Sequence, residues 1–302
     1  MGDETINLGA IERVKDPRDW KLGAIQAPVQ LPLSYMPANS LDWYPKYYQA
    51  ELPTCGANAG SSYQNVALPT NVPLSPRELW REIKNIDGFP LSAGTDMRSI
   101  FKALCNQGVS SEAVVPNDIG LSLEEYSNLT LTPEILADAL KRKGLNYAFI
   151  DNDAPPTLED IKQATYQNKA CLVLIKCDDG FFGTQYPTFS ANPPYGHFVN
   201  VIGWTEEDIA IFDSTEQNES LSVKYIDNKY INPTFFREGG VIGEFTQPKD
   251  PVPSSVETPH PINIPTVPLI HPTLTHAELS FLSNLLLQMQ KILDEILKRS
   301  QK

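Results

Sequence analysis

ELPTCGANAGSSYQNVAL, residues 51–68, carries the strongest structural signal in this chain of 302 residues. It indicates a loop that runs directly into a helix, with Cys55 in the first turn of that helix. Unpaired backbone amides and the helix dipole at such a position stabilise a thiolate, which is the attacking form of cysteine. Small residues such as Gly56 and Gly60 let another element or a substrate approach closely. We therefore predict that Cys55 is a nucleophile.

A histidine is the usual partner of such a thiol, and the first 250 residues contain a single one, His197. It lies in the strand-like segment 196–204, which a short acidic turn joins to a second one, 208–214. A hairpin centred on Thr205 places His197 opposite Asp213 on one face, with Cβ atoms about 5 Å apart. The carboxylate then fixes the imidazole tautomer and stabilises its protonated form. The alternative is that His197 is structural and Asp213 only begins a turn.

The apolar periodicity changes from helical to strand-like near residue 145. Helix N-caps are predicted at Ser75, Thr95, Thr132 and Thr157. Apolar residues alternate with a period of two in residues 145–151, 170–178, 196–204 and 208–214. A helical N-terminal half followed by an antiparallel β half predicts an α+β fold of two packed parts.

The composition is that of an acidic globular protein. The formal net charge is −13 and 41% of the residues are hydrophobic, which excludes fibrous and wholly disordered chains. Nucleic acid and anionic membranes are unsuited as main partners, because either requires a basic face. The N-terminus lacks the features of a signal peptide, so we expect none. The four cysteines match no zinc pattern and are expected to be free thiols in a reducing compartment.

Composition divides the chain into a main domain, 1–245, and two further parts, 246–273 and 274–302. Eight prolines lie between Pro248 and Pro272, so the middle part is predicted to be an extended, semi-rigid linker. The last part has apolar residues in the 3-4 alternation of an amphipathic, coiled-coil-type helix, with too many charges for a membrane span. We predict that this C-terminal helix docks on another protein chain or self-associates. The alternative is that it folds back onto its own domain.

Three stretches resemble, in order, the papain-like cysteine peptidases, in particular their short bacterial and phage-type members. LDWYPKYYQAELPTCGANA, residues 41–59, resembles the segment with an Asp-Trp pair, a glutamine and the cysteine that opens the central helix. GTDMRSIFKALCNQGVSSEAVVPND, residues 94–118, resembles the substrate-binding glycine with the helix and turn after it. GHFVNVIGW followed by IAIFDST resembles the histidine strand and the strand with the orienting residue.

This resemblance implies the papain-like two-part fold and a role for each of five residues. Cys55 is the implied nucleophile, His197 the base, and Asp213 the orienting residue where the family usually has asparagine. Gln49 is the implied oxyanion donor, and Gly94 the substrate-binding residue. The implied reaction is endopeptidase cleavage of a peptide or protein substrate through a Cys-His-Asp triad and a thioester, without metal or organic cofactor.

Two other functions fit the same residues. The fold can serve as an assembly module of a larger complex such as a phage virion, attached by its linker and C-terminal helix and having lost or minor activity. It can also cleave peptidoglycan, as an amidase or endopeptidase. We accordingly expect a cytoplasmic or virion-associated protein.

Overall fold

The computed structural model describes residues 8–36, 47–68, 72–151 and 154–244. The predicted linker, 246–273, and the predicted C-terminal helix, 274–302, lie outside these residues, so both remain predictions. Among the described residues, no helix has the length and apolar character that crossing a membrane requires.

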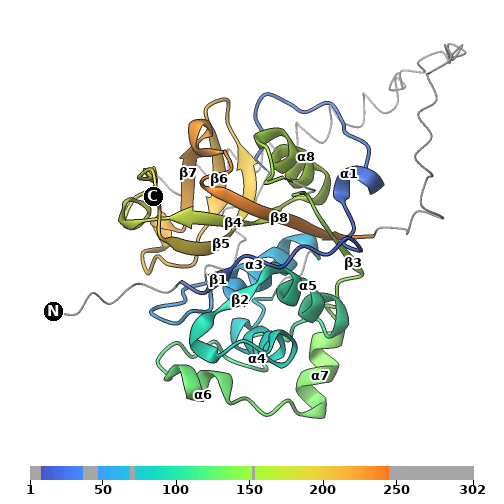
Figure 1. Ribbon diagram of the computed structural model, residues 1–302. Coiled ribbons are helices and arrows are strands. Elements are labelled where there is room, and N and C mark those ends of the chain that lie inside the picture. Colours follow the sequence, from blue (N-terminus) through green and yellow to red (C-terminus); the bar gives the residue numbers. More distant parts are fainter. Residues whose placement is uncertain (1–7, 37–46, 69–71, 152–153, 245–302) are drawn as a thin grey trace, which may run out of the picture. The chain divides into compact units, whose positions relative to one another are not determined.

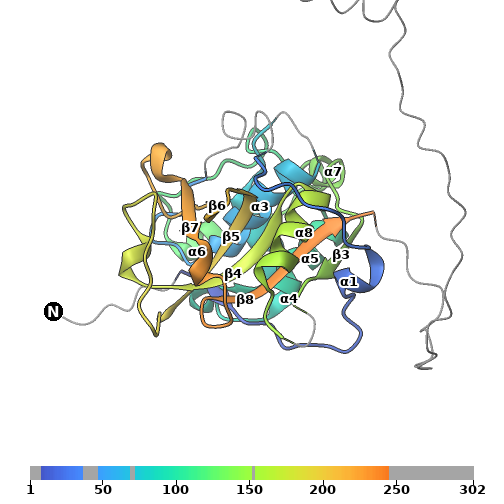
Figure 2. The ribbon, with the colours of Figure 1, turned by 90° about the horizontal axis from the view of Figure 1, so that it is seen from above.

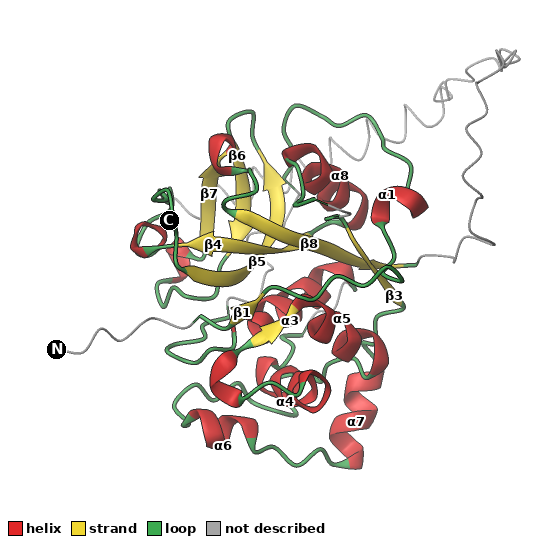
Figure 3. Cartoon of the chain, in the orientation of Figure 1, coloured by secondary structure: helices red, strands yellow, loops and turns green. Residues whose placement is uncertain are grey.

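Helices are the main regular structure in the first half of the described chain (Figure 1). They are α1 (Leu22–Ile25), α3 (Cys55–Ala67), α4 (Pro76–Asp87), α5 (Met97–Asn106), α6 (Leu123–Ser127) and α7 (Pro133–Leu140). Helix α3 is central, because it packs against α4 and α5 and also against strands β4 (Cys171–Cys177) and β5 (Tyr195–Trp204). Figure 3 shows α4, α6 and α7 on one side of α3, and the large sheet, with α1 and α8 (Leu158–Asn168) beside it, on the other.

Three of the four predicted N-caps are confirmed. The side chains of Ser75, Thr132 and Thr157 each accept a backbone hydrogen bond at the start of α4, α7 and α8. The prediction for Thr95 was wrong, because the carboxylate of Asp96 caps α5 by accepting from the Ser99 amide. Thr95 instead belongs to the short strand β2 (Thr95–Asp96), whose backbone is paired with another segment and cannot begin the helix.

A six-stranded antiparallel sheet forms the second half, with the order β3-β8-β4-β5-β6-β7. Its remaining strands are β3 (Asn146–Phe149), β6 (Asp208–Phe212), β7 (Val223–Asp227) and β8 (Phe236–Gly243). Helix α8 links β3 to β4 and packs against β4, β5 and β8. The view from above in Figure 2 shows β7 and β6 at one end of the sheet and β3 near the other. The predicted α+β fold, with a helical part packed on an antiparallel sheet, is confirmed.

The register of the β5–β6 hairpin differs from the prediction. Asn200 pairs with Phe212, whereas a hairpin centred on Thr205 pairs Asn200 with Ala210. The difference is already present next to the turn, where Trp204 pairs with Ile209, so the hairpin is centred between Glu206 and Glu207. The irregularity within β5 changes the register by only one residue. Asp213 therefore follows the last residue of β6 and is not directly opposite His197 in the ladder. Hydrophobic alternation alone does not reveal where the turn is centred.

Hydrogen bonds hold α3 against the sheet. The side-chain amide of Asn200, on β5, donates to the carbonyl of Ala59 at 2.9 Å. The hydroxyl of Tyr63 accepts from the amide of Ile242, on β8, at 2.8 Å. All four residues are buried, so these bonds form away from bulk water and fix the start of α3 beside β5.

The small residues of α3 allow the neighbouring helices to approach closely. A Cβ atom at Gly60 would lie 2.8 Å from Ile100 Cγ2 and 2.9 Å from Leu79 Cδ2. Real Cβ contacts are longer, so a side chain at this position forces α4 or α5 to shift. Gly23, in α1, is the opposite case, because an added Cβ there meets no atom within 4 Å.

We predict that Gly60→Ala lowers the free energy of unfolding by about 1–2 kcal/mol. Overpacking a dense core costs about 1–3 kcal/mol, which exceeds the gain of up to about 1 kcal/mol from replacing glycine in a helix. Gly23→Ala is the matched control and leaves stability unchanged or slightly higher. Urea denaturation of the two variants checks this, and equal stability of both contradicts it.

Candidate active site

Cys55 begins α3 and is fully buried. Burial raises the pKa of its thiol to about 12, while hydrogen bonds from the backbone amides of Phe198 and Gly56 act in the opposite direction. The predicted helix-start environment is present, but the exclusion of water outweighs it. The thiol is therefore protonated at neutral pH in this conformation.

His197 lies on β5, next in sequence to the amide that faces the Cys55 sulfur, and is fully buried. Its Nε2 lies 2.7 Å from Oδ1 of Asp213. An ionised carboxylate accepts only, so we assign the proton of the neutral ring to Nε2. Nδ1 is then the basic nitrogen, and it is buried with no hydrogen-bond partner within the described part of the chain. Nε2 is thus held by Asp213, while Nδ1 is available to accept a proton.

Asp213 is held by several donors besides His197. The hydroxyl of Thr215 donates to Oδ2 at 2.6 Å, and the Thr215 amide donates to Oδ1 at 3.1 Å. Burial acts to raise the pKa of the Asp213 carboxyl, but the hydrogen bond and charge of His197, the charge of Lys224 and the bond from Thr215 together bring it below its ordinary value. Asp213 therefore stays ionised and keeps accepting from the imidazole.

Gln49, the predicted oxyanion donor, lies beside the residue that follows Asp213. Its side-chain oxygen accepts from the hydroxyl of Ser214 at 2.8 Å, and its backbone amide donates to the Ser214 carbonyl at 2.9 Å. Its Nε2 donates to the carbonyl of Leu52 at 3.0 Å and to that of Leu8 at 3.4 Å. The side-chain amide of Gln49 is thus oriented through its oxygen, and its nitrogen already donates to two backbone carbonyls.

Leu8, whose carbonyl accepts from Gln49 Nε2, is the first residue of an extended segment, residues 8–13, which we name the strap. Its strand β1 (Ala10–Ile11) pairs in parallel with β2, and the Gly9 carbonyl accepts from the Thr95 amide at 2.8 Å. On the opposite side, a Cβ atom at Gly196 would lie 2.5 Å from the Ala10 carbonyl oxygen. An extended segment therefore lies between the helical part and the residue that precedes His197.

Gly94, the predicted substrate-binding residue, touches the same segment. A Cβ atom there would collide with the Gly9 backbone, and the φ angle of 82° is in the left-handed region that favours glycine. The Gly94 carbonyl accepts from the ammonium of Lys84. A glycine is required at this position because the backbone of an extended segment passes directly over it.

Arg13 anchors the far end of the strap in a buried ion cluster. Its Nη1 lies 2.9 Å from Oδ2 of Asp151, and its backbone amide donates to Glu238 Oε1 at 2.7 Å. The guanidinium carbon lies 3.6 Å from the ring centroid of Phe149. Burial raises the pKa of Glu238 to about 7, although the charge of Arg13 opposes the shift. Breaking a buried pair of this kind is strongly destabilising, so Arg13 holds the strap in place.

An aromatic ring that the sequence analysis did not identify covers the imidazole. The rings of Phe181 and His197 meet edge to face, with centroids 5.6 Å apart. Phe181 ends a short 3₁₀ turn after β4, so nothing in the residues around His197 indicates it. The strap was missed for the same reason, because it contacts the site only through the tertiary structure.

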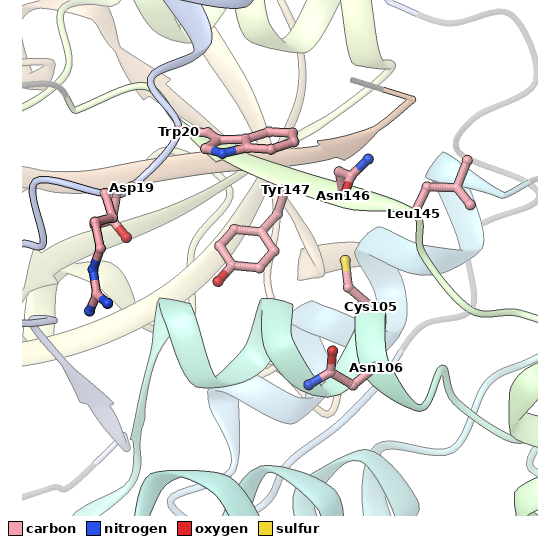
Figure 4. Close-up of a pocket in the computed structure, with 8 residues that line it drawn as sticks. Asp19, Trp20, Cys105, Asn106, Leu145, Asn146 and Tyr147 are labelled. Atoms are coloured by element: carbon pink, nitrogen blue, oxygen red, sulfur yellow. The ribbon is translucent and has the colours of Figure 1, made fainter. Parts of the chain in front are cut away.

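A separate pocket of about 270 Å³ opens elsewhere on the described chain (Figure 4). Trp20 and Tyr147 line it, together with Cys105 and Asn106 of α5. None of the five predicted site residues lines this pocket. In the described ranges, no group of three or more His, Cys, Asp or Glu side chains is arranged to hold a metal ion.

No protein-family model matches the sequence, and no curated protein matches it. Solved structures do match. Xylellain, a cysteine protease from Xylella fastidiosa, has a TM-score of 0.66 and 17% identity, covering 78% of this chain and 95% of its own. Digestive procathepsin L 3 of Tenebrio molitor larval midgut has a TM-score of 0.59 and 14% identity, covering 78% and 76%. The chain has the papain-like fold.

A third structure adds a bacterial surface-layer protein to this group. The cysteine protease and lectin-like domains of Cwp84 from Clostridium difficile have a TM-score of 0.54 and 16% identity, covering 73% of this chain and 53% of that one. At such identities the likeness is one of fold. The bacterial or phage-type subgroup named from the sequence remains a prediction.

We predict that Arg13→Ala makes Cys55 react with iodoacetamide about tenfold faster at pH 8, because a loosened strap lets water and reagent reach the thiol. Mass spectrometry of the labelled peptides measures the rate. Arg18→Ala is the matched control, since Arg18 pairs with Asp16 at an exposed position.

General unfolding exposes every thiol, so labelling of Cys171 and Cys177 reports on it. Faster labelling at Cys55 alone, with those two buried cysteines unlabelled, is the expected pattern. Equal Cys55 rates in the parent chain and both variants contradict the role given to Arg13.

Proposed function

We propose that this protein is a cysteine endopeptidase with Cys55 as nucleophile, His197 as base and Asp213 as orienting residue. The observation that carries the proposal is the orientation of the imidazole. Asp213 holds Nε2 at 2.7 Å, while Nδ1 is buried and without a partner among the described residues, and the backbone amide of the next residue, Phe198, faces the Cys55 sulfur. This is the arrangement that a thiol requires of its base.

The reaction follows from these groups. Nδ1 of His197 takes the thiol proton, and the Cys55 sulfur attacks the carbonyl carbon of the substrate. The resulting oxyanion accepts hydrogen bonds from Gln49 Nε2 and from the backbone amide of Cys55. The imidazolium then protonates the leaving amine as the C–N bond breaks and a thioester forms. Water, deprotonated by His197, hydrolyses the thioester and restores the thiol.

An extended polypeptide is the substrate class that the contacts of the strap favour. The strap already lies beside Gly94 as a short parallel strand, and its Leu8 carbonyl accepts from the proposed oxyanion donor. Backbone pairing of this kind is independent of side-chain identity, so another extended chain can bind in its place. The strap must leave before a substrate enters, and the closed conformation is accordingly a resting state.

The two other functions considered from the sequence have no comparable support. The predicted assembly role depends on the linker and C-terminal helix, which lie outside the described residues. No contact among the described residues favours peptidoglycan over a protein substrate. Hydrolysis of a protein substrate such as casein is therefore the first activity to measure.

We predict that Cys55→Ala and His197→Ala each abolish casein hydrolysis, in the full chain and in the Arg13→Ala background that opens the site. Cys105→Ser is the matched control, because Cys105 lines the separate pocket. We expect this variant to keep the activity of the parent. Cleavage of a fluorescent casein by each variant is the measurement. Activity that persists without the Cys55 thiol excludes the proposal.

We predict that Gln49→Glu lowers kcat about 10²–10³-fold with little change in KM, because it removes a donor that acts on the oxyanion. The substituted side chain keeps an oxygen for the Ser214 hydroxyl but loses the bonds to the Leu8 and Leu52 carbonyls, so urea denaturation of the variant is measured beside kcat. Ser214→Ala leaves the donor but frees its orientation, and it produces a smaller loss. An unchanged kcat in Gln49→Glu shows that another group stabilises the oxyanion.

A further inference from the structure

A fully buried lysine, Lys224 of β7, lies beside the carboxylate oxygen of Asp213 that His197 does not use. Its ammonium nitrogen is 3.5 Å from Oδ2 of Asp213 and 2.6 Å from Oε1 of Glu216. A buried charge is costly unless it is paired and hydrogen-bonded. The three charges thus form one cluster behind the imidazole.

The remaining bonds of Lys224 reach the loop that covers His197. Its ammonium donates to the carbonyls of Phe181 at 2.8 Å and Thr184 at 3.1 Å. It also lies 4.7 Å from the centroid of the Phe181 ring, whose edge-to-face partner is His197. With Glu216 as the third acceptor, these bonds use all three protons of the ammonium. Asp213 therefore interacts with Lys224 mainly through charge.

We propose that Lys224 is a positioning residue of this site, whose charge reduces the negative charge that Asp213 presents to His197 and whose hydrogen bonds hold Phe181 against the imidazole. The proposal rests on the proposed function in taking His197 as the base. Papain-like peptidases usually have a neutral asparagine where this chain has Asp213. A fully charged carboxylate binds the imidazole proton more tightly than an amide does, and the lysine offsets that difference.

Other titratable groups face the same cluster. They are Cys55 on α3, Cys177 at the end of β4, and Asp178 directly after it. Burial raises the pKa of Cys177 well above its ordinary value, so that thiol is neutral. The Asp178 carboxylate accepts from the amides of Ser190 and Gly180, and none of the variants at Lys224 and Glu216 changes either bond.

Three substitutions test the effect of this cluster on the titration of His197, two with opposite expected shifts and one as a control. Lys224→Met removes the positive charge, so His197 binds its proton more tightly and its ring titrates at a pH about one unit higher. Glu216→Gln removes the counter-charge of Lys224 but keeps an oxygen for the Gly183 amide, and the ring titrates at lower pH. Lys224→Arg retains the charge and leaves the titration close to that of the parent. A purely structural lysine predicts no such opposite shifts.

The measurement is the titration of the His197 ring protons by NMR, in the full chain with Cys55→Ala to prevent cysteine chemistry. The signal is assigned by its loss in His197→Gln, which the presence of only four histidines makes practical. The pH profile of kcat/KM, in chains that keep Cys55, is the second readout. Its limb that reports His197 shifts in the same direction as the ring titration.

The outcomes separate this inference from the proposed function. Opposite shifts in Lys224→Met and Glu216→Gln support it, even where no peptidase activity is found, because ring titration does not depend on turnover. Titration midpoints that are equal in all variants overturn it, while leaving the peptidase proposal intact. If Lys224→Met does not fold, Glu216→Gln decides: a shift to lower pH supports the inference, and no shift or a shift to higher pH overturns it.

Discussion

The buried hydrogen bond between His197 and Asp213 is the interaction on which the rest of the site depends. A carboxylate without access to water remains ionised only if other groups stabilise its charge. Thr215 and Lys224 provide this stabilisation, from the segment after β6 and from β7. The cost of burying the carboxylate thus explains why polar groups from separate strands converge behind one imidazole. It also determines that Nδ1 is the ring nitrogen without a partner among the described residues.

The strap explains two further features that otherwise appear unrelated. It lies along the site in an extended conformation, which accounts for the glycine at position 94 and for the occupied amide of Gln49. It also packs in the same apolar core as Cys55, whose thiol is cut off from water and therefore neutral. One segment of a few residues thus constrains the backbone at position 94 and occupies the side-chain amide of Gln49, and the buried charges around Arg13 hold it there.

Local patterns predicted local structure well. The caps at Ser75, Thr132 and Thr157 were correct because a cap involves residues only three positions apart. Thr95 failed because its backbone pairs with a strand far away in the sequence, which no local pattern includes. The hairpin register failed because the turn, closed by the hydrogen bond from the Thr205 amide to the Asp208 carbonyl, is centred beyond Thr205. Even so, the prediction that His197 and Asp213 meet is correct, because their side chains form a hydrogen bond beyond the last ladder pair, Asn200 with Phe212.

The amino-acid sequence by itself determined the α+β class, the helix that Cys55 opens, and the pairing of a lone histidine with Asp213. These depend on periodicity, capping and short connections, all of which act over neighbouring residues. Only the tertiary structure decided that Phe181 covers the imidazole, that Lys224 lies behind Asp213, and that the strap passes over Gly94 and accepts from Gln49. Those contacts join residues far apart in the chain, and burial, the quantity that governs their charges, exists only once the chain has folded.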